Sequence, residues 1–215
     1  MPRALLVDLD DTLLDDRGAM AAAVLQLRAQ RSLAPEVDDS ALVQVWDSVG
    51  RQLWRAMGLG QITFQEQRRL RLRQVFKLQI SDDAADSLFA DYLAHYERAW
   101  ALLPGAQEFL QATAHLPRVI VTNGNKPQAL RKTDKLGLTN QFLAVVTPED
   151  CGARKPDPRI FLHALGLLGV SAEETLMIGD NLEADLVPAA ALGMRTFHVN
   201  HLEVSQSIRH APGVA

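Results

Sequence analysis

A short apolar run, Ala4–Val7, lies near the start of the chain, and aspartates follow it at positions 8, 10 and 11. A continuous apolar run of this length predicts a strand that is buried on both faces of a parallel sheet. Side chains two positions apart on a strand point to the same side, so we expect Asp8 and Asp10 on one side and Leu9 on the other. The pattern therefore predicts a buried strand that ends in paired carboxylates.

From Asp15 to Trp100 the apolar residues recur at the spacing of amphipathic helices. This pattern predicts an all-helical subdomain, with no strand of its own, inserted directly after the first strand. The predicted helices are Ala19–Arg31, Ser40–Met57, Phe64–Leu78 and Asp83–Trp100.

After Gly105 the pattern alternates between short apolar strands and helices. Such alternation predicts βαβ units, and hence a doubly wound parallel α/β sheet with helices on both faces. We expect a core domain from residues 1–14 and 102–215, and a helical insert over residues 15–101. In chain order the predicted elements are strand Arg118–Thr122, helix Pro127–Leu136, strand Phe142–Thr147, helix Pro158–Leu168, strand Thr175–Ile178, helix Ala184–Leu192 and strand Arg195–Val199.

Composition narrows the class of protein. Apolar residues make up 47% of the chain, enough for a large core, and the net charge of −4 argues against general nucleic-acid binding. Cys151 is the only cysteine, so no internal disulfide is possible and a reducing compartment is expected. No apolar run has the length of a signal peptide or a membrane span. We expect a cytoplasmic globular protein with no membrane partner. The oligomeric state stays open between a monomer and a weak dimer.

The aspartates after the first strand pose an electrostatic problem. Carboxylates held close together at the end of a buried strand repel one another and lose hydration, and both effects oppose ionisation. A hard divalent cation with oxygen ligands would resolve the problem. The simpler alternative is an acidic turn in which Asp11 or Thr12 caps a helix.

Further polar residues follow the other predicted strands. In an open α/β sheet, ligands bind beyond the carboxyl ends of the strands. These groups are Thr122-Asn123-Gly124, Lys155-Pro156-Asp157, and Gly179-Asp180 with Asp185. Each could instead be explained structurally, as a turn, a solvated loop or a helix start. Their positions at the ends of successive strands favour one shared site.

Together with Asp8-Leu9-Asp10-Asp11-Thr12, these groups resemble the four motifs of the haloacid dehalogenase-like hydrolases. The resemblance implies a Rossmann-like core, and the position of the helical insert is similar to that of the family's cap. It implies that Asp8 is the nucleophile that becomes an aspartyl phosphate and that Asp10 is the general acid and base. It also implies that Lys155 is a catalytic cation beside Asp8.

The resemblance further implies a Mg²⁺ cofactor. Its ligands would be the Asp8 carboxylate, the Asp10 main-chain carbonyl and Asp180, with Asp185 supporting the metal site. Phosphate oxygens would be bound by Thr122, Asn123, Gly124 and Lys155.

Asp10 separates branches of the family. Halide leaves without a proton, and the dehalogenating members typically lack an aspartate two residues after the nucleophile. With Asp10 at this position, the chain therefore resembles a phosphatase that acts on a small phosphorylated metabolite. A 2-haloacid dehalogenase and a non-catalytic binding protein stay as alternatives. Sugar phosphates, nucleoside monophosphates and phosphoglycolate are all compatible substrates.

Two other features of the sequence are expected to have structural roles. Arg68, Arg69, Arg71 and Arg73 form a basic run on a predicted helix, which favours a solvated face over a nucleic-acid or substrate patch. Cys151 is expected to be a structural thiol in a loop.

Overall fold

The computed structural model describes residues 1–200. The chain divides into two compact units. Met1–Asp15 and the chain from Ala101 onward form the first, which we call the core unit. Asp16–Trp100 forms the second, which we call the helical unit.

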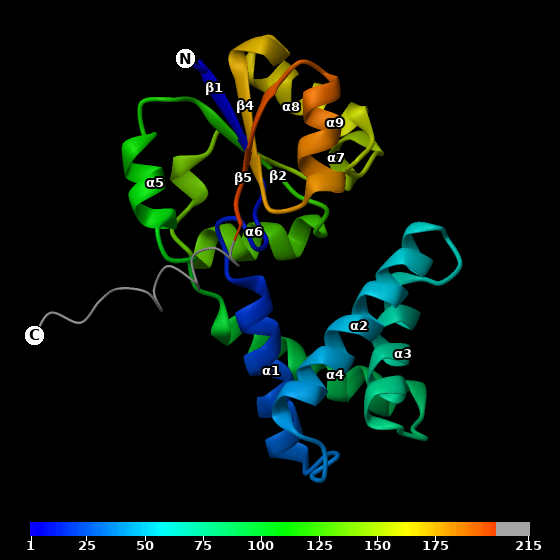
Figure 1. The fold of residues 1–215 in the computed structure, drawn as a ribbon. Coiled ribbons are helices and arrows are strands. Elements are labelled where there is room, and N and C mark those ends of the chain that lie inside the picture. Colours follow the sequence, from blue (N-terminus) through cyan, green and yellow to red (C-terminus); the bar gives the residue numbers. More distant parts are fainter. Residues whose placement is uncertain (201–215) are drawn as a thin grey trace, which may run out of the picture. The chain divides into compact units, whose positions relative to one another are not determined.

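The core unit is built on a five-stranded sheet in the order β3-β2-β1-β4-β5, and every neighbouring pair is parallel (Figure 1). This confirms the predicted doubly wound α/β fold. The first strand, β1, lies in the centre and is buried along its whole length. The strands are β1 Ala4–Val7, β2 Arg118–Val121, β3 Ala144–Val146, β4 Thr175–Gly179 and β5 Arg195–His198.

Helices cover the sheet, with α5 to its left and α8 and α9 to its right in Figure 1. One face of the sheet packs against α8 and α9 in a cluster that includes Leu6, Val119 and Phe161. Alternation along β1 directs Leu5 and Val7 to the opposite face. The core-unit helices are α5 Ala106–Ala112, α6 Lys126–Lys135, α7 Pro148–Cys151, α8 Pro158–Leu168 and α9 Val187–Ala191, with short turns η1 Thr139–Gln141, η2 Ala172–Glu174 and η3 Leu182–Leu186.

The predicted boundaries differ from the structure in several places. The short helix α5 was not predicted, and the strand predicted over Phe142–Thr147 is shorter. The helix predicted over Ala184–Leu192 is a π-helical turn followed by α9. Pro188 has no N–H to donate, so a regular helix cannot run unbroken through it. Cys151 ends the helical turn α7 instead of lying in a loop.

The helical unit contains four helices and no strand, as predicted. Side chains satisfy the free N–H groups at three of the helix starts. Asp38 caps α2, Ser81 caps α4, and Thr63 forms a reciprocal capping box with Glu66 at α3. The helices are α1 Asp16–Arg31, α2 Asp39–Gly58, α3 Phe64–Phe76 and α4 Asp82–Ala99.

An aromatic cluster fills the interior of the helical unit. Trp46 of α2 is fully buried, and its ring centroid lies 6.0 Å from Phe76 and 4.7 Å from Tyr92. Phe89 also contacts both Trp46 and Tyr92. Aromatic side chains bury large apolar areas, so this unit has a hydrophobic core of its own.

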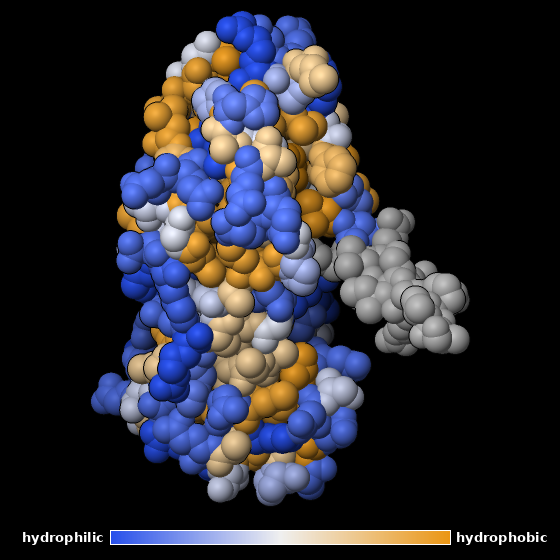
Figure 2. Space-filling view, turned by 90° about the vertical axis from the view of Figure 1, so that its left-hand side faces the viewer, coloured by the Kyte–Doolittle hydropathy of each residue, from blue (hydrophilic) through white to orange (hydrophobic). Residues whose placement is uncertain are grey.

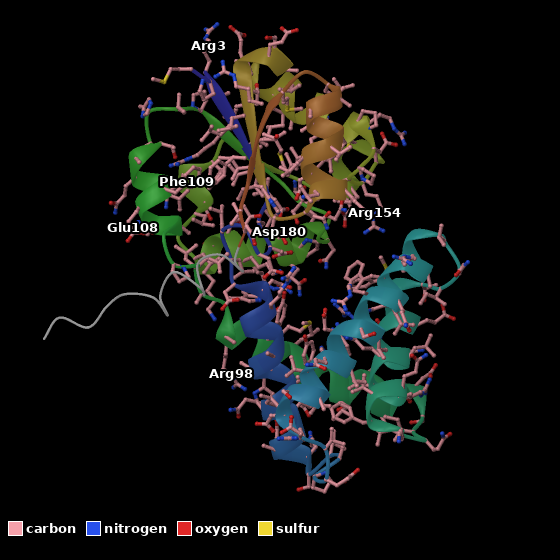
Figure 3. The ribbon with its side chains drawn as sticks, viewed as in Figure 1. Arg3, Arg98, Glu108, Phe109, Arg154 and Asp180 are labelled. Atoms are coloured by element: carbon pink, nitrogen blue, oxygen red, sulfur yellow. The ribbon has the colours of Figure 1, made fainter. Side chains whose placement is uncertain are left out.

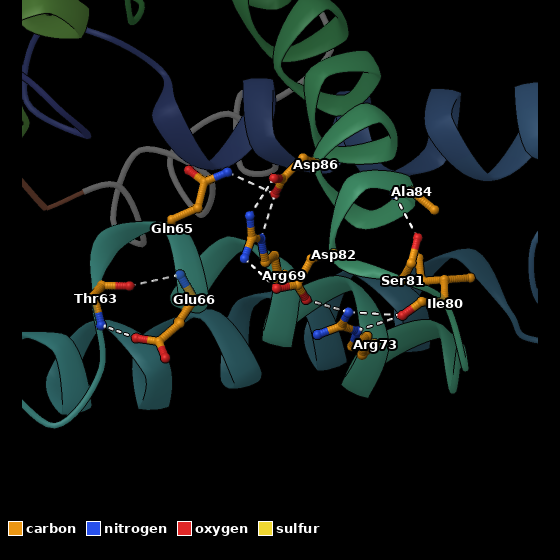
Figure 4. Close-up of polar contacts among 10 residues, drawn as sticks. All are labelled: Thr63, Gln65, Glu66, Arg69, Arg73, Ile80, Ser81, Asp82, Ala84 and Asp86. Carbon is orange, nitrogen blue, oxygen red and sulfur yellow. Dashed lines mark hydrogen bonds and ion pairs between the residues drawn. The ribbon is translucent and has the colours of Figure 1, made fainter.

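The prediction of a solvated arginine face on α3 is wrong. Arg69 donates to Asp86 of α4 at 2.7 Å, and Arg73 donates to the carbonyl of Ile80 at 2.8 Å (Figure 4). Both arginines also pair with Asp82. These contacts join α3 to the start of α4 across the helix surface. Helix α3 therefore uses its positive charge for packing within the unit.

Arg71 is buried, with 7% of its surface exposed. Its guanidinium lies 4.3 Å from the centre of the Trp46 ring, and its Nε and Nη2 donate to the Trp46 carbonyl at 3.2 and 3.1 Å. Gly50 makes room for it, since a Cβ at that position would lie 2.5 Å from Arg71 Nη2. This close approach explains a glycine in the interior of α2.

Apolar side chains also reach the surface of the described residues, such as Leu143 and Phe197 in the core unit. On the face drawn in Figure 2, hydrophobic residues are interspersed with hydrophilic ones. Such mixing is usual for folded proteins. Among residues 1–200, no helix combines the length and the apolar character needed to cross a bilayer.

We expect Gly50→Ala to destabilise the helical unit, although alanine favours helix more than glycine does. The new methyl group would displace the buried Arg71 side chain, and overpacking of this kind costs about 1–3 kcal/mol. The matched control is Gly166→Ala in α8, where nothing lies within 4 Å of a new Cβ. The control is expected to gain about 0.5–1 kcal/mol. Urea unfolding of both variants checks this prediction, and an equal gain in the free energy of unfolding for the two variants would contradict it.

Candidate active site

The loop after β1 is held by backbone hydrogen bonds. The N–H of Asp8 donates to the carbonyl of Ile178 in β4 at 2.9 Å, which extends the sheet one residue beyond β1. The N–H of Leu13 then donates back to the carbonyl of Leu9 at 3.0 Å. This tight turn determines where the Asp8 and Asp10 side chains leave the backbone.

Lys155 lies between two buried carboxylates. Its Nζ is 2.5 Å from Asp8 Oδ1 and 2.5 Å from Asp185 Oδ1. All three residues are buried, with exposed fractions of 5% for Asp8, 5% for Lys155 and 1% for Asp185. The other oxygen of Asp8 accepts a hydrogen bond from Thr12 Oγ1 at 3.2 Å. Residues that are 147 positions apart in the chain therefore form one charged cluster.

Burial raises the pKa of Asp8 to about 6, because its loss of hydration outweighs the attraction of Lys155. Burial also acts to lower the pKa of Lys155, but Asp8 and Asp185 together outweigh it, so that pKa is raised. The ammonium therefore stays charged. With both carboxylates ionised the cluster keeps an uncompensated negative charge, which favours a further cation.

Asp10 has a different partner. Lys132 Nζ of α6 donates to Asp10 Oδ1 at 2.6 Å. The Lys132 side chain is buried, with 4% exposed, whereas 31% of the Asp10 side chain is exposed. The two neighbouring aspartates are thus held by separate lysines.

The residues after β2 form a compact loop. Thr122 is buried, and its Oγ1 accepts a hydrogen bond from the N–H of Gly124 at 3.0 Å. The side chain of Asn123 contacts the backbone of Lys155 on both sides: Oδ1 accepts from its N–H at 2.8 Å, and Nδ2 donates to its carbonyl at 3.0 Å. Asn123 therefore fixes the segment that carries Lys155. The predicted phosphate contacts of this loop stay a prediction.

The residues after β4 form the fourth part of the site. Asn181 Oδ1 accepts from the N–H groups of Glu183 and Ala184 at 3.1 and 2.9 Å, which starts the π-helical turn that carries Asp185. A Cβ at Gly179 would lie 2.5 Å from Asp185 Oδ2. Glycine is therefore required for Asp185 to pack against the end of β4. Figure 3 shows Asp180 at this end of the sheet.

Asp8, Asp180 and Asp185 form a cluster that fits a cation. Each offers a carboxylate oxygen, and these oxygens lie within 4.8 Å of one another. Ligands on opposite sides of Mg²⁺ are separated by about 4 Å, and Mg²⁺ prefers oxygen donors. Small side-chain shifts would let the three carboxylates hold such an ion. The predicted contribution of the Asp10 main-chain oxygen stays a prediction.

The structure thus brings Asp8, Lys155, Asp180 and Asp185 together, with Asn123 behind Lys155. Sequence reasoning missed Lys132. Its local pattern is the helical spacing with Ala129 and Thr133, and the structure shows that this face of α6 is buried. A lysine on a buried helix face requires a partner.

The sequence model of the haloacid dehalogenase-like hydrolase family matches residues 2–193 of this chain. The chain belongs to this family. The predicted family is thereby confirmed, and membership makes the protein a hydrolase. In this chain Asp8, Thr122 and Asp180 lie directly after β1, β2 and β4.

Individual relatives of this haloacid dehalogenase-like hydrolase include phosphatases. It is 30% identical to phosphoglycolate phosphatase from Rhodospirillum rubrum, over 90% of this chain and 78% of that protein. The HAD-hydrolase YfnB from Bacillus subtilis, solved with bound magnesium, is 28% identical with a TM-score of 0.79, over 93% of this chain and 89% of that chain. L-2-haloacid dehalogenase from Xanthobacter autotrophicus shares the fold, at 22% identity and a TM-score of 0.73, over 100% of this chain and 85% of that chain.

We expect Gly179→Ala to disturb the site and to lower stability by about 1–3 kcal/mol, because the new methyl group overlaps the buried Asp185 side chain. Gly166→Ala is again the matched control, in the same unit and with open space around it. Urea unfolding of the metal-free proteins measures the difference. A Gly179→Ala variant as stable as the wild type would show that Asp185 is not packed as described.

Proposed function

We propose that this hydrolase is a Mg²⁺-dependent phosphomonoesterase that acts on a small phosphorylated metabolite through an aspartyl phosphate on Asp8. The observation that carries the proposal is the Asp10 carboxylate, two residues after Asp8, paired at 2.6 Å with the buried Lys132 ammonium. A phosphate ester needs a proton for its leaving oxygen, and Asp10 is the group that would supply it.

In the first step the Asp8 carboxylate attacks phosphorus, an O–P bond forms, and the bond to the leaving oxygen breaks. A carboxylate nucleophile divides one difficult displacement into two easier ones. Lys155, at 2.5 Å, favours the ionised form of Asp8 against the effect of burial, and would offset the negative charge of the phosphoryl group. The contact of Lys155 with both Asp8 and Asp185 supports this role.

Asp10 carries the proton in both steps. In the first step its protonated carboxyl group gives the proton to the leaving oxygen as the P–O bond breaks. The carboxylate that results then takes a proton from the water that attacks the aspartyl phosphate, which restores the acid. The second step releases phosphate and restores the Asp8 carboxylate. The partial exposure of the Asp10 side chain, 31%, supports this role, because the same group must meet both leaving group and water.

Phosphate oxygens would be bound by Thr122, by the loop at Asn123 and Gly124, and by Lys155. Backbone N–H groups in a tight loop suit an anionic oxygen. The side chain of Asn123 is engaged by the Lys155 backbone, so its proposed contact with phosphate uses the main-chain N–H.

Mg²⁺ would be held by the Asp8 carboxylate, the Asp10 main-chain oxygen and Asp180, with Asp185 supporting the site. When bound, the ion neutralises charge on the phosphoryl oxygens. The acidic cluster of Asp8, Asp180 and Asp185 supports this assignment.

We propose that the helical unit is a cap, which selects the leaving group of the substrate, while the core unit carries the chemistry. The similarity to phosphoglycolate phosphatase supports a small phosphorylated metabolite as substrate. A panel of sugar phosphates, nucleoside monophosphates and phosphoglycolate, assayed with Mg²⁺, would identify the class. Halide release from 2-haloacids without phosphatase activity would instead establish a dehalogenase, and inactivity on both panels a binding protein.

Metal removal tests the cofactor. We expect chelation to abolish phosphatase turnover and added Mg²⁺ to restore it. Ca²⁺ is expected to substitute poorly, because its larger and more flexible coordination shell misplaces nucleophile and phosphorus. Release of phosphate measured with excess chelator, then with each ion, provides the comparison. Full turnover in chelator would refute the metal assignment.

Substitution of each aspartate by asparagine separates their roles. Asp8→Asn is expected to eliminate turnover, because an amide is a poor nucleophile. Asp10→Asn is expected to lose a factor on the order of 10²–10⁴ with an alkyl phosphate, and less with a nitrophenyl ester, whose leaving group needs little protonation.

Rapid quench followed by mass measurement of the Asp8 peptide checks the intermediate. The aspartyl phosphate is expected to persist longer in Asp10→Asn, because the base that activates water is gone. Equal defects on both substrates, with no phosphorylated Asp8 at any time, would mean that Asp10 is not the acid–base residue.

A further inference from the structure

We propose that Lys132 is a positioning residue, which holds the Asp10 carboxylate in the orientation needed for proton transfer. The inference rests on the proposed phosphatase function and adds to it a residue from outside the four motifs. It starts from the hydrogen bond of 2.6 Å between Lys132 Nζ and Asp10 Oδ1.

The burial of Lys132 shows that this contact is specific. Only 4% of its side chain is exposed, and removal of an ammonium from water is unfavourable unless a partner compensates. An exposed lysine would gain little from such a pair. Here the buried ammonium has a fixed place, so the carboxylate oxygen bonded to it has one too.

The geometry of α6 explains how Lys132 reaches the site. Helix α6 starts directly after the Thr122–Gly124 loop, with Asn125 as its cap. Side chains of a helix lean toward its N-terminus. The long side chain of Lys132 therefore runs back along α6 toward that loop and meets Asp10 there.

The second oxygen of Asp10 also has a defined place. A Cβ at Gly124 would lie 3.9 Å from Asp10 Oδ2. Oδ1 faces Lys132 while Oδ2 lies on the side of Gly124, next to the loop proposed to bind phosphate. With Oδ1 held, Oδ2 is the oxygen oriented for proton transfer at the leaving group.

Lys132 and Lys155 have separate tasks. Lys155 lies 2.5 Å from Asp8 and from Asp185, whereas Lys132 contacts Asp10. Loss of Lys132 therefore leaves the contacts of Lys155 with Asp8 and Asp185 in place. The defect is expected in the step that needs Asp10 to be aligned, and not in substrate binding.

The test compares Lys132→Met and Lys132→Arg with the wild type in the presence of Mg²⁺. For an alkyl phosphate we expect Lys132→Met to lower kcat about 10- to 100-fold, since misplacement of a reacting group by about 1 Å has this effect. KM is expected to change less than about 2-fold. With a nitrophenyl phosphate the loss of kcat is expected to be several-fold smaller, because that leaving group needs little protonation. Lys132→Arg keeps the donor and is expected to restore part of kcat.

Lys135→Met, an exposed lysine of the same helix, is the matched control and is expected to behave as the wild type. Circular dichroism establishes whether each variant is folded. If Lys132→Met does not fold, the comparison of Lys132→Arg with the wild type still provides the test. A rise in KM at constant kcat, an equal loss of kcat on both substrates, or no loss would each overturn the inference. Absence of wild-type phosphatase activity would instead overturn the proposed function, so the two failures are distinguishable.

Discussion

One electrostatic constraint governs the site: a buried ammonium requires buried carboxylates around it. Lys155 lies 2.5 Å from Asp8 and from Asp185, and all three groups are nearly inaccessible to water. A single charge in this place would be strongly unfavourable, and removal of one partner from a buried pair is destabilising. The end of β1, the segment before α8 and the turn after β4 are therefore held together by charge, and Asn123 fixes the Lys155 backbone from the side of β2.

The order of the strands makes this convergence possible. The chain moves outward from β1 to β2 and β3, then crosses to the other side of β1 with β4. Ligands in open α/β sheets bind where the strand order reverses in this way. Asp8 follows β1 and Asp180 follows β4, so carboxylates from distant parts of the chain meet at that point. The remaining negative charge of the cluster favours a divalent cation.

Asp8 and Asp10 are close in sequence but differ in environment. Asp8 is buried beside Lys155, and its pKa is raised to about 6 by loss of hydration. Asp10 is partly exposed and pairs with Lys132 from α6. We propose that Asp8, in the buried environment, is the nucleophile and that Asp10, in the partly exposed one, carries the proton. The helical unit, with its aromatic core and its arginine contacts, forms a separate compact unit in which positive charge is used for packing.

Local patterns in the chain were enough to predict the parallel sheet, the inserted helices and the strand ends where polar residues gather. Apolar periodicity reports which face of an element is buried, and this information is local. The contact of Lys132 and the burial of Arg71 were not predicted, because each depends on residues outside its own segment. The break in the last helix, by contrast, has a local cause in Pro188. Lys132 is 122 positions from Asp10, and only the packing of α6 brings them together. A basic residue has the same local pattern on a solvated or a buried face, so tertiary structure decides which partner compensates its charge.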